Sequence, residues 1–343
     1  MLELARELLA GEEAWVVGGA VRDELLGREL VDLDIAVRDP RGAARAFANR
    51  AGGAPFALSE RHGAWRVALE DGRTVDFTPL PGPIEADLAT RDFTINAIAR
   101  PLAGGGPVDP FGGRTDLEAH RLRAVGEGVF RDDPLRLLRA VRLEDELELR
   151  LDEETEQFVQ RDAELVTKPS GERIVAELRR LSAGGYRRLD GLGLLAPLGG
   201  RIDDRLDRWD SPDYRLVAVF GEELRRFPVS NELRRFAAAL LRAEPPGQDA
   251  RAIHRFRRAS EPWALEALAF AGASELGPAV EEARASDPAE PLLRGDELDL
   301  PPGPEIGRLL YEIEEERAAG TIATKEEALD YARRNAGAVR KDG

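Results

Sequence analysis

The chain has 343 residues, a formal net charge of −16, 43% hydrophobic and 33% charged residues, and no cysteine. This length allows two or more domains, and the composition is typical of a soluble globular protein. The lack of cysteine excludes disulfides, thiolate zinc sites and cysteine nucleophiles. No signal peptide and no apolar run of membrane-spanning length is visible, so we expect a cytoplasmic protein with no membrane partner.

In chain order, residues 1–10 predict a short helix, 15–17 a strand, 20–26 a helix that Gly27 ends, and 31–37 a strand. Residues 44–49 are helical, 64–69 and 74–80 predict two strands, and 91–99 is a helix-prone stretch. These elements predict a small mixed α/β domain. From about residue 115 onward amphipathic helices follow one another, with Pro/Gly-rich breaks at 244–248 and 301–304.

The strand over residues 31–37 places two acidic residues on one face. Val31, Leu33, Ile35 and Val37 alternate there with Asp32, Asp34 and Ala36. Because alternate side chains of a strand project to opposite faces, the carboxylates of Asp32 and Asp34 project together. Hard divalent cations such as Mg²⁺ take carboxylate oxygens, and a pair of them can hold a nucleophile and a phosphate in line. The competing interpretation is a solvated polar face on a half-exposed strand.

A glycine pair precedes this strand. Gly18 and Gly19 form a predicted tight turn between a strand and a helix. A glycine turn that opens a helix leaves backbone N–H groups free to face a phosphate, although such pairs also serve as plain turns. Together, the turn and the carboxylate pair predict a site for a phosphate and a metal.

Several motifs in a fixed order resemble the class II tRNA nucleotidyltransferases, which are the bacterial CCA-adding enzymes and their poly(A) polymerase relatives in the DNA polymerase β-like superfamily. The segments that carry the resemblance span nearly the whole chain and are 18–27 with Asp32 and Asp34, 91–97, 109–117, 132–142, 172–174, 302–307 and 324–329.

The resemblance implies an α+β fold: a polymerase β-like nucleotidyltransferase head followed by an elongated all-helical neck, body and tail. The expected boundaries are 1–123 for the catalytic head, 124–185 for the nucleotide-selecting neck, 186–250 for the body and 251–343 for the tRNA-binding tail. The implied reaction adds CMP, and in the main interpretation AMP, from CTP and ATP to the tRNA 3′ end. Pyrophosphate is released. The sequence predicts no oligomeric state.

The resemblance also implies roles for the acidic residues. Asp32 and Asp34 would be catalytic and would hold Mg²⁺. Sites of this class often add a third carboxylate from a neighbouring strand, for which Asp76 is the candidate. The alternative for Asp76 is a polar residue on the outer face of an edge strand.

Arg22 and Arg91 are the expected triphosphate clamps, because a guanidinium makes two charge-assisted bonds to phosphate oxygens. Asp92 and Asn96 lie four residues apart on the predicted helix and could orient the ribose or an arginine. The alternative is that Asp92 caps or pairs within the domain.

Asp133 and Arg136 are the candidates for base selection. Cytosine and adenine each present an amine donor beside a ring-nitrogen acceptor, and guanine and uracil reverse that order. A carboxylate next to a guanidinium therefore matches C and A. The alternative is that Asp133 caps a helix whose first residue is Pro134, with Arg136 beside it; both roles can hold together.

The net negative charge does not exclude RNA, because arginines are concentrated locally. Arg136, Arg139 and Arg142 recur at every third residue and could meet the triphosphate or the acceptor stem. Further arginines suit contact with the tRNA backbone, although such runs are usually solvated. These are Arg234, Arg235, Arg255, Arg257, Arg258, Arg333 and Arg334.

The sequence departs from the family pattern in places. The second motif has Thr90 where an arginine is frequent, and the fourth begins with Asp132 rather than glutamate. Residues 143–148 are unusually acidic, which argues against RNA contact there. Only residues 81–90 separate the predicted strand from Arg91, where CCA-adding members carry a longer loop. This shortness supports a CC-adding enzyme as one alternative. An A-adding enzyme or poly(A) polymerase, and a catalytically inactive RNA-binding protein, are the others.

Overall fold

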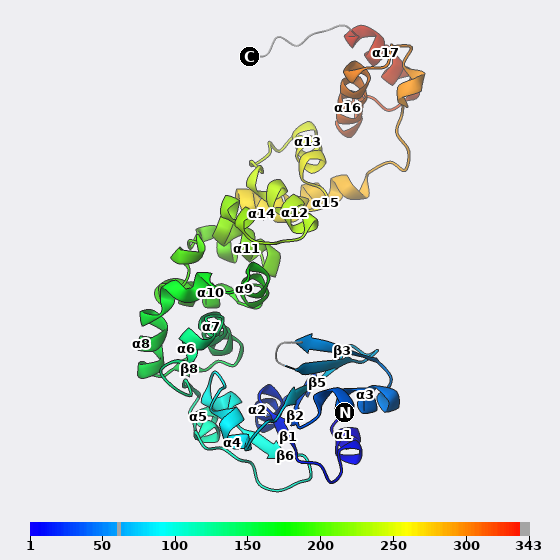
Figure 1. Ribbon diagram of the computed structural model, residues 1–343. Helices are drawn as coiled ribbons and strands as arrows, with labels where there is room; N and C mark the ends of the chain where they lie inside the picture. The colour runs from blue at the N-terminus through cyan, green and yellow to red at the C-terminus, as the bar shows by residue number, and fades with distance from the viewer. Residues whose placement is uncertain (60–62, 337–343) are drawn as a thin grey trace. The chain divides into compact units, whose positions relative to one another are not determined.

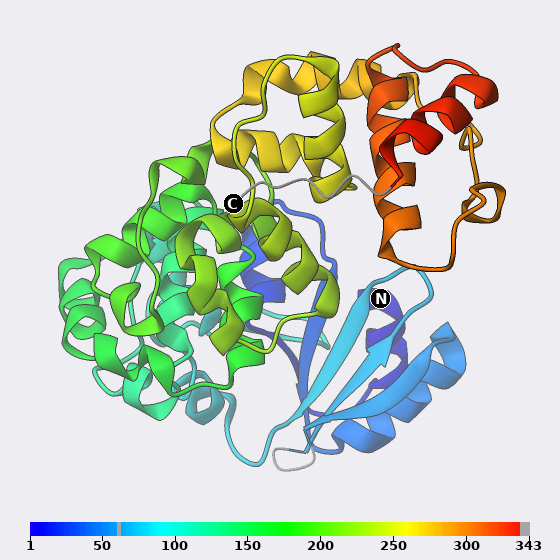
Figure 2. The same cartoon turned by 90° about the horizontal axis from the view of Figure 1, so that it is seen from above.

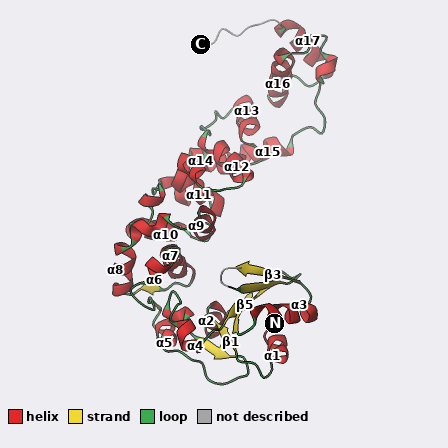
Figure 3. Ribbon diagram, in the orientation of Figure 1, coloured by secondary structure: helices red, strands yellow, loops and turns green. Residues whose placement is uncertain are grey.

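The computed structural model describes residues 1–59 and 63–336. The chain forms two compact units, Met1–Gly199 and Gly200–Gly343. Every strand assigned in the described residues lies in the first unit, as the yellow arrows of Figure 3 show. The predicted α+β class, with a mixed head followed by helices, is confirmed. The four-part division of the chain stays a prediction.

One six-stranded sheet organises the head, in the order β3-β4-β5-β2-β1-β6 (Figure 1). Strands β2 and β5 are parallel, and the other neighbours are antiparallel. The strands are β1 Ala14–Val17, β2 Asp32–Val37, β3 Ala54–Ser59, β4 Ala64–Ala68, β5 Thr74–Pro79 and β6 Ala99–Pro101.

Helix α3 (Pro40–Ala51) covers one face of this sheet. Asp39 caps its amino end, where its carboxylate accepts the N–H of Gly42, and proline suits the first turn. Its Phe47 ring meets Phe77 of β5 at 5.9 Å, over the side of β2 that carries Leu33 and Ile35. Because side chains alternate, Asp32 and Asp34 project from the opposite face.

The other helices of the head are short. They are α1 Leu2–Leu8, α2 Gly19–Leu25, α4 Ile84–Leu88, the 3-10 helix η1 Thr94–Asn96 and α5 Gly113–Glu118. Ile84 and Leu88 of α4 join a buried cluster with Val17, Ala36 and Leu80. This cluster anchors the segment between β5 and Arg91 to the end of the sheet.

One prediction for the head is wrong, and one strand was missed. The stretch 91–99 is not a helix, because only η1 is helical and the chain then enters β6 beside β1. Phe93, Ile95, Ala97 and Ile98 are all fully buried, so this run packs on every side instead of presenting one apolar face. Strand β3 was not predicted, since its residues up to Leu58 are exposed on both faces and show no alternation.

Beyond the head, the first unit continues as helices with one short parallel pair, β7 (Arg121–Leu122) and β8 (Arg150–Leu151). Helix α7 packs against α9 and α10. The elements are α6 Val129–Asp132, α7 Arg136–Glu146, α8 Glu153–Arg161, η2 Ala163–Thr167, α9 Gly171–Leu178, α10 Ala183–Gly191 and η3 Ala196–Leu198.

In its described residues the second unit is helical throughout, and its last part has a core of its own around Leu309 and Ile313. No helix of the described chain combines the length and apolar character needed to cross a membrane. The elements are η4 Asp204–Asp207, α11 Pro212–Phe220, η5 Gly221–Arg226, α12 Asn231–Leu241, α13 Ala250–Ser260, α14 Ala264–Ala271, η6 Ser274–Leu276, α15 Gly277–Ala285, η7 Gly295–Glu297, α16 Pro304–Ala318 and α17 Lys325–Asn335.

Candidate active site

The two carboxylates of β2 sit in different environments. Asp32 is exposed, and its Oδ1 accepts the hydroxyl of Thr74 at 2.7 Å. Asp34 is partly buried, and its pKa is raised to about 6, first by burial and then by the charge of Asp76; Asp32 adds to this and Arg91 opposes it. An anion in this position is stabilised by a nearby cation.

The turn before α2 brings the backbone close to this carboxylate. Gly18 has a positive φ of 68°, and a Cβ there would lie 2.7 Å from Nη1 of Arg91 and 3.4 Å from Oδ2 of Asp34. Any side chain at this position would therefore displace the arginine and strain the backbone. The turn thus places the start of α2 beside Asp34 and Arg91.

A cavity of about 850 Å³ opens between the head and the helices that follow it. Its volume is in the range of small-molecule sites. It brings together most of the predicted site residues from segments far apart in the chain: Gly18, Gly19, Arg22, Asp32, Asp34, Arg91, Asp92, Asn96, Asp133, Arg136, Arg139 and Arg142. Asp76 is the one predicted site residue that does not line it.

Asp76 lies directly opposite Asp34 in the register of β5 and β2. Both of its carboxylate oxygens accept from Arg66 of β4 at 2.7 Å, and this bond raises the pKa of the Arg66 guanidinium. Strand β5 lies inside the sheet, so the edge-strand interpretation of Asp76 is wrong. Its role as a third metal ligand stays a prediction.

A chain of hydrogen bonds links α2 to α7. Nη1 of Arg22 donates to Asn96 Oδ1 at 2.8 Å, and Asn96 Nδ2 donates to Asp92 Oδ1 at 2.9 Å. Asp92 Oδ2 accepts Nε of Arg139 at 2.8 Å. Burial opposes the charge on Asp92, yet Arg139 and the bonds from Asn96 and Phe93 hold its pKa below the usual value. Asp92 thus pairs within the protein, across 47 residues of sequence.

Arg91 is held by Asp87 of α4, which accepts its Nε at 3.1 Å and its Nη2 at 2.8 Å. The carboxylate fixes one edge of the guanidinium, and Nη1 remains near Gly18. Arg91 is therefore held in one orientation at the wall of the cavity.

The helix-cap interpretation of Asp133 needs correction. Helix α7 begins at Arg136, and Asp133 Oδ1 accepts the N–H of Leu135 at 3.2 Å in the turn before it. Arg136 does not pair with Asp133 but donates to the carbonyls of Thr90 at 2.7 Å and Val129 at 3.3 Å. The partner of Asp133 is Arg173, 2.9 Å away.

The other two arginines of α7 point inward. Arg139 is paired with Asp92, and Arg142 is buried with its Nε 3.1 Å from Glu177. Burial, above all, lowers the pKa of Arg142. Two of the three arginines in the predicted stripe are thus engaged in ion pairs.

The acidic run after Arg142 also has internal partners. Glu144 accepts the N–H of Leu151 and binds Arg188, and Glu146 binds Arg180. These carboxylates hold helices together, so their charge does not by itself decide whether RNA binds nearby. Sequence reasoning missed Arg173 and Arg180 as cavity residues, because no spacing links them to α7.

Several arginines expected to meet tRNA form pairs within the second unit. Arg255 binds Glu315, and the buried Arg257 binds Glu261 and Asp287. Arg333 pairs with Asp330 at 3.1 Å, and Arg234 donates to Asn231. Contact of these arginines with tRNA stays a prediction.

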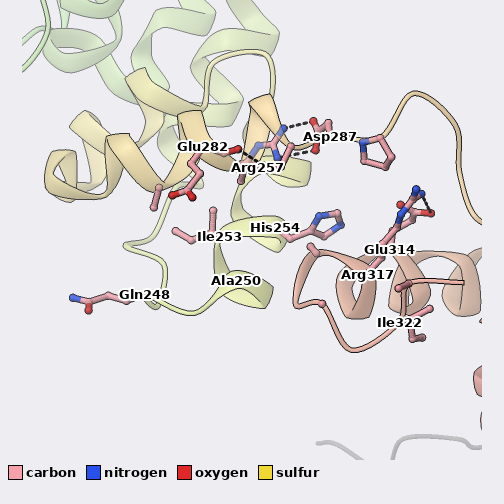
Figure 4. Close-up of a pocket in the computed structure, with 17 residues that line it drawn as sticks. Gln248, Ala250, Ile253, His254, Arg257, Glu282, Asp287, Glu314, Arg317 and Ile322 are labelled. Carbon is pink, nitrogen blue, oxygen red and sulfur yellow. Dashed lines mark hydrogen bonds and ion pairs between the residues drawn. The ribbon is translucent and has the colours of Figure 1, made fainter. Parts of the chain in front are cut away.

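A second cavity, of about 660 Å³, lies between α13, α15 and the end of α16 (Figure 4). Its charges mostly neutralise one another, since Arg257 pairs with Asp287 and Arg317 with Glu314. Burial is the main cause that lowers the pKa of His254, which lines it. This cavity holds no same-face carboxylate pair like Asp32 and Asp34, so we assign the chemistry to the first.

The described residues contain no group of three or more His, Cys, Asp or Glu side chains arranged to hold a metal ion. Two carboxylates still fit Mg²⁺, which is usually bound by one or two carboxylates together with substrate phosphates and water. The observation that supports this fit is that Asp32 and Asp34, two residues apart on β2, line the same cavity.

Comparisons with protein families, curated proteins and solved structures all find tRNA nucleotidyltransferases or their head domain. Residues 14–80 and 69–123 match the poly A polymerase head domain. An A-adding tRNA nucleotidyltransferase of Deinococcus radiodurans is 34% identical over 94% of this chain and 95% of that protein. A CC-adding tRNA nucleotidyltransferase of Thermus thermophilus is 32% identical over 93% of each chain. A solved complex of a CCA-adding enzyme with ATP has a TM-score of 0.80 at 21% identity, covering 98% of this chain and 95% of that one.

The raised pKa of Asp34 predicts that this carboxylate lowers the free energy of unfolding at neutral pH. Between its ordinary pKa of 3.8 and about 6 the folded chain binds the extra proton, so the free energy of unfolding falls as pH rises through this window. At pH 7.5 without divalent metal, Asp34→Asn should therefore stabilise the protein by up to about 3 kcal/mol. The gain should shrink toward pH 4. Thermal unfolding measures both.

Asp32→Asn is the matched control, because Asp32 is exposed on the same strand and should give little gain. An Asp34→Asn protein less stable than wild type at pH 7.5 without metal would contradict the electrostatic account of the site.

Proposed function

Because the chain belongs to the tRNA nucleotidyltransferase family, we propose that it extends the 3′ end of tRNA with CMP and AMP from CTP and ATP, releasing pyrophosphate and building the CCA terminus. The observation that carries this proposal is the single cavity that gathers Asp32, Asp34, the Gly18 turn and Arg91. As expected from the sequence, we place the activity in the cytoplasm.

Nucleotidyltransferases generally use a divalent metal, and we propose Mg²⁺, held by Asp32 and Asp34. When bound, the metal would lower the pKa of the attacking ribose hydroxyl and neutralise the triphosphate. The N–H groups at Gly18 and Gly19 and the guanidinium of Arg91 would bind the phosphate oxygens on the β1 side of Asp34. Arg22, held by Asn96 through Nη1 and by Asp23 through Nε and Nη2, would supply a further guanidinium there.

Base selection would fall to Asp133 and Arg136, which both line the cavity. The carboxylate of Asp133 can accept the amine of cytosine or adenine, and Arg136 can donate to the adjacent ring nitrogen. Arg173 supports Asp133, and the Thr90 carbonyl holds Arg136, so the two groups are fixed separately. A guanine or uracil would leave polar groups unpaired, at about 1–3 kcal/mol for each.

A second candidate is an enzyme that adds only the two cytidines. The segment between β5 and Arg91 is short, and the buried Ile84 and Leu88 of α4 anchor it to the sheet. This favours a fixed connection over a long loop. The relative from Thermus thermophilus, named a CC-adding enzyme, supports the same candidate. The relative from Deinococcus radiodurans, named an A-adding enzyme, keeps the A-adding alternative open. The intact Asp32/Asp34 pair opposes an inactive RNA-binding protein.

The decisive test is incorporation into tRNA that lacks its last three nucleotides, with CTP and ATP supplied singly and together. A CCA-adding enzyme should extend this tRNA by two nucleotides with CTP alone and by three with both. A product that stays two nucleotides longer would select the CC-adding candidate. Extension only of a tRNA already ending in CC, with ATP, would select an A-adding enzyme.

Replacing either catalytic carboxylate should abolish this incorporation. We expect Asp32→Ala and Asp34→Ala to lose roughly a thousand-fold or more in kcat, because each removes a proposed ligand of the metal that would stabilise the charge developing in the transition state. Asp71→Ala, at an exposed turn of the same domain, is the control and should retain normal turnover. Normal activity of Asp32→Ala would contradict the catalytic role of Asp32, whereas absence of incorporation by the wild type would support the inactive RNA-binding alternative.

Asn96 should act by positioning Arg22. Asn96→Ala removes the bond to Arg22 and one to Asp92, so we expect kcat/KM for CTP to fall roughly 5- to 30-fold, about 1–2 kcal/mol. The KM for tRNA should stay near the wild-type value. Steady-state kinetics with CTP and tRNA varied separately distinguishes the effect on kcat/KM for CTP from the effect on the KM for tRNA.

The control is Asn49→Ala, an exposed asparagine of α3 in the same unit, which should leave both constants unchanged. A loss confined to the KM for tRNA would show that Asn96 does not serve the triphosphate side of the site.

A further inference from the structure

We propose that the open face of β3 and β4, with the exposed ring of Phe56 beside Arg66, is the platform on which the tRNA terminus stacks behind its reacting hydroxyl. This inference rests on the proposed function, because it assigns a place to the RNA substrate of that reaction. It names Phe56 as a positioning residue for the RNA.

Phe56 stands in one row with the catalytic carboxylate. The register sets Phe56 opposite Arg66, Arg66 opposite Asp76, and Asp76 opposite Asp34. Residues directly opposite one another on paired strands project from the same face. Phe56 is therefore on the catalytic face, three strands from Asp34, or about 14 Å at the usual spacing of neighbouring strands.

On the opposite face, α3 covers β4. Trp65, next to Arg66 in the chain, faces α3, where the guanidinium groups of Arg41 and Arg45 lie 5.5 Å and 5.9 Å from its ring. Figures 1 and 2 show α3 running along the strands on that side. Phe56 projects from the face that α3 leaves uncovered and is 45% exposed.

The geometry of the reaction selects this side of the sheet for the RNA. Gly18 follows β1, and β1 and β5 flank β2 on opposite sides. The pyrophosphate would leave toward Gly18 and Arg91, and in-line displacement requires the attacking hydroxyl on the other side of the α-phosphorus. The RNA end must therefore approach over β5, β4 and β3, the strands that lead to Phe56.

The side chains of Phe56 and Arg66 suit the binding of an RNA end of any sequence. Stacking on an aromatic ring tolerates every base, since each has a π-face. The pair with Asp76 uses Nε and Nη2 of Arg66, and its Nη1 takes no part in that pair. This nitrogen can meet a backbone phosphate, which makes the platform one stacking group beside one cation.

The test uses the full chain and tRNA lacking its terminal nucleotides. Phe56→Ala should raise the KM for tRNA roughly ten-fold, with the KM for CTP and the kcat at saturating tRNA within two-fold of wild type. Phe56→Trp should restore the wild-type KM. Leu58→Ala is the matched control, because Leu58 is equally exposed at 45% on the same strand but has no aromatic ring, and it should change the KM less than two-fold.

A readout independent of turnover is the fluorescence of 2-aminopurine placed one nucleotide before the 3′ end. It should be quenched by wild type and Phe56→Trp but not by Phe56→Ala. An unchanged KM for tRNA in Phe56→Ala would overturn the inference. An equal effect of Leu58→Ala would also overturn it, because it would indicate a general apolar docking edge. Absence of CMP incorporation by wild type would instead defeat the proposed function, and this inference with it.

Discussion

The carboxylate of Asp34 is the group around which the candidate active site is arranged. It is placed on an interior strand, with Asp32 two residues before it and Asp76 opposite it on β5. Three like charges on one sheet face repel one another, and the rise in the pKa of Asp34 to about 6 reflects that repulsion together with burial. The fold maintains this arrangement because Leu33 and Ile35 of the same strand are fully buried beneath α3.

Each of the three carboxylates has a different neighbour that offsets this repulsion. Arg66 neutralises Asp76 through two bonds, and Thr74 holds Asp32 by one. Asp34 is left beside Arg91, whose other edge is bound to Asp87. The side chains of the site thus hold one another in place, and Asp34 is the one carboxylate of the three with no such hydrogen bond among the described residues. This is a preorganised arrangement, in which the side chains need little rearrangement when charged ligands enter.

Hydrogen bonds also fix the side chains on the other side of the cavity, where helix α7 lies. Arg139 of α7 is bonded to Asp92 of the head, and Asp92 is connected through Asn96 to Arg22. The segment that carries the candidate base-selecting residues is therefore joined to the one beside the phosphates. Gly113 allows the start of α5 to pack closely against η1, because a Cβ at this position would lie 2.1 Å from the carbonyl oxygen of Thr94.

Local patterns in the sequence were enough to predict β2, the Gly18 turn and the shared face of Asp32 and Asp34, because alternation and turn chemistry act over a few residues. The partners of these groups were not predictable. Arg66 and Arg173 reach their aspartates through strand pairing or helix packing, with no spacing signal.

The same limit explains the errors in secondary structure. The stretch 91–99 is buried on all sides, so its apolar residues carry no helical or strand period. Strand β3 is exposed on both faces and is specified by its pairing with β4. Family resemblance supplied the order of the motifs, and the structure supplied the contacts between them.

The most direct test of the central claim is a crystal structure of the protein with Mn²⁺ and a CTP analogue that cannot be cleaved, with the metal located by its anomalous signal. We expect Mn²⁺ bound by oxygens of both Asp32 and Asp34, and the terminal phosphates directed toward Gly18 and Arg91. Metal bound elsewhere, or a triphosphate lying over β4 and β3, would contradict the account.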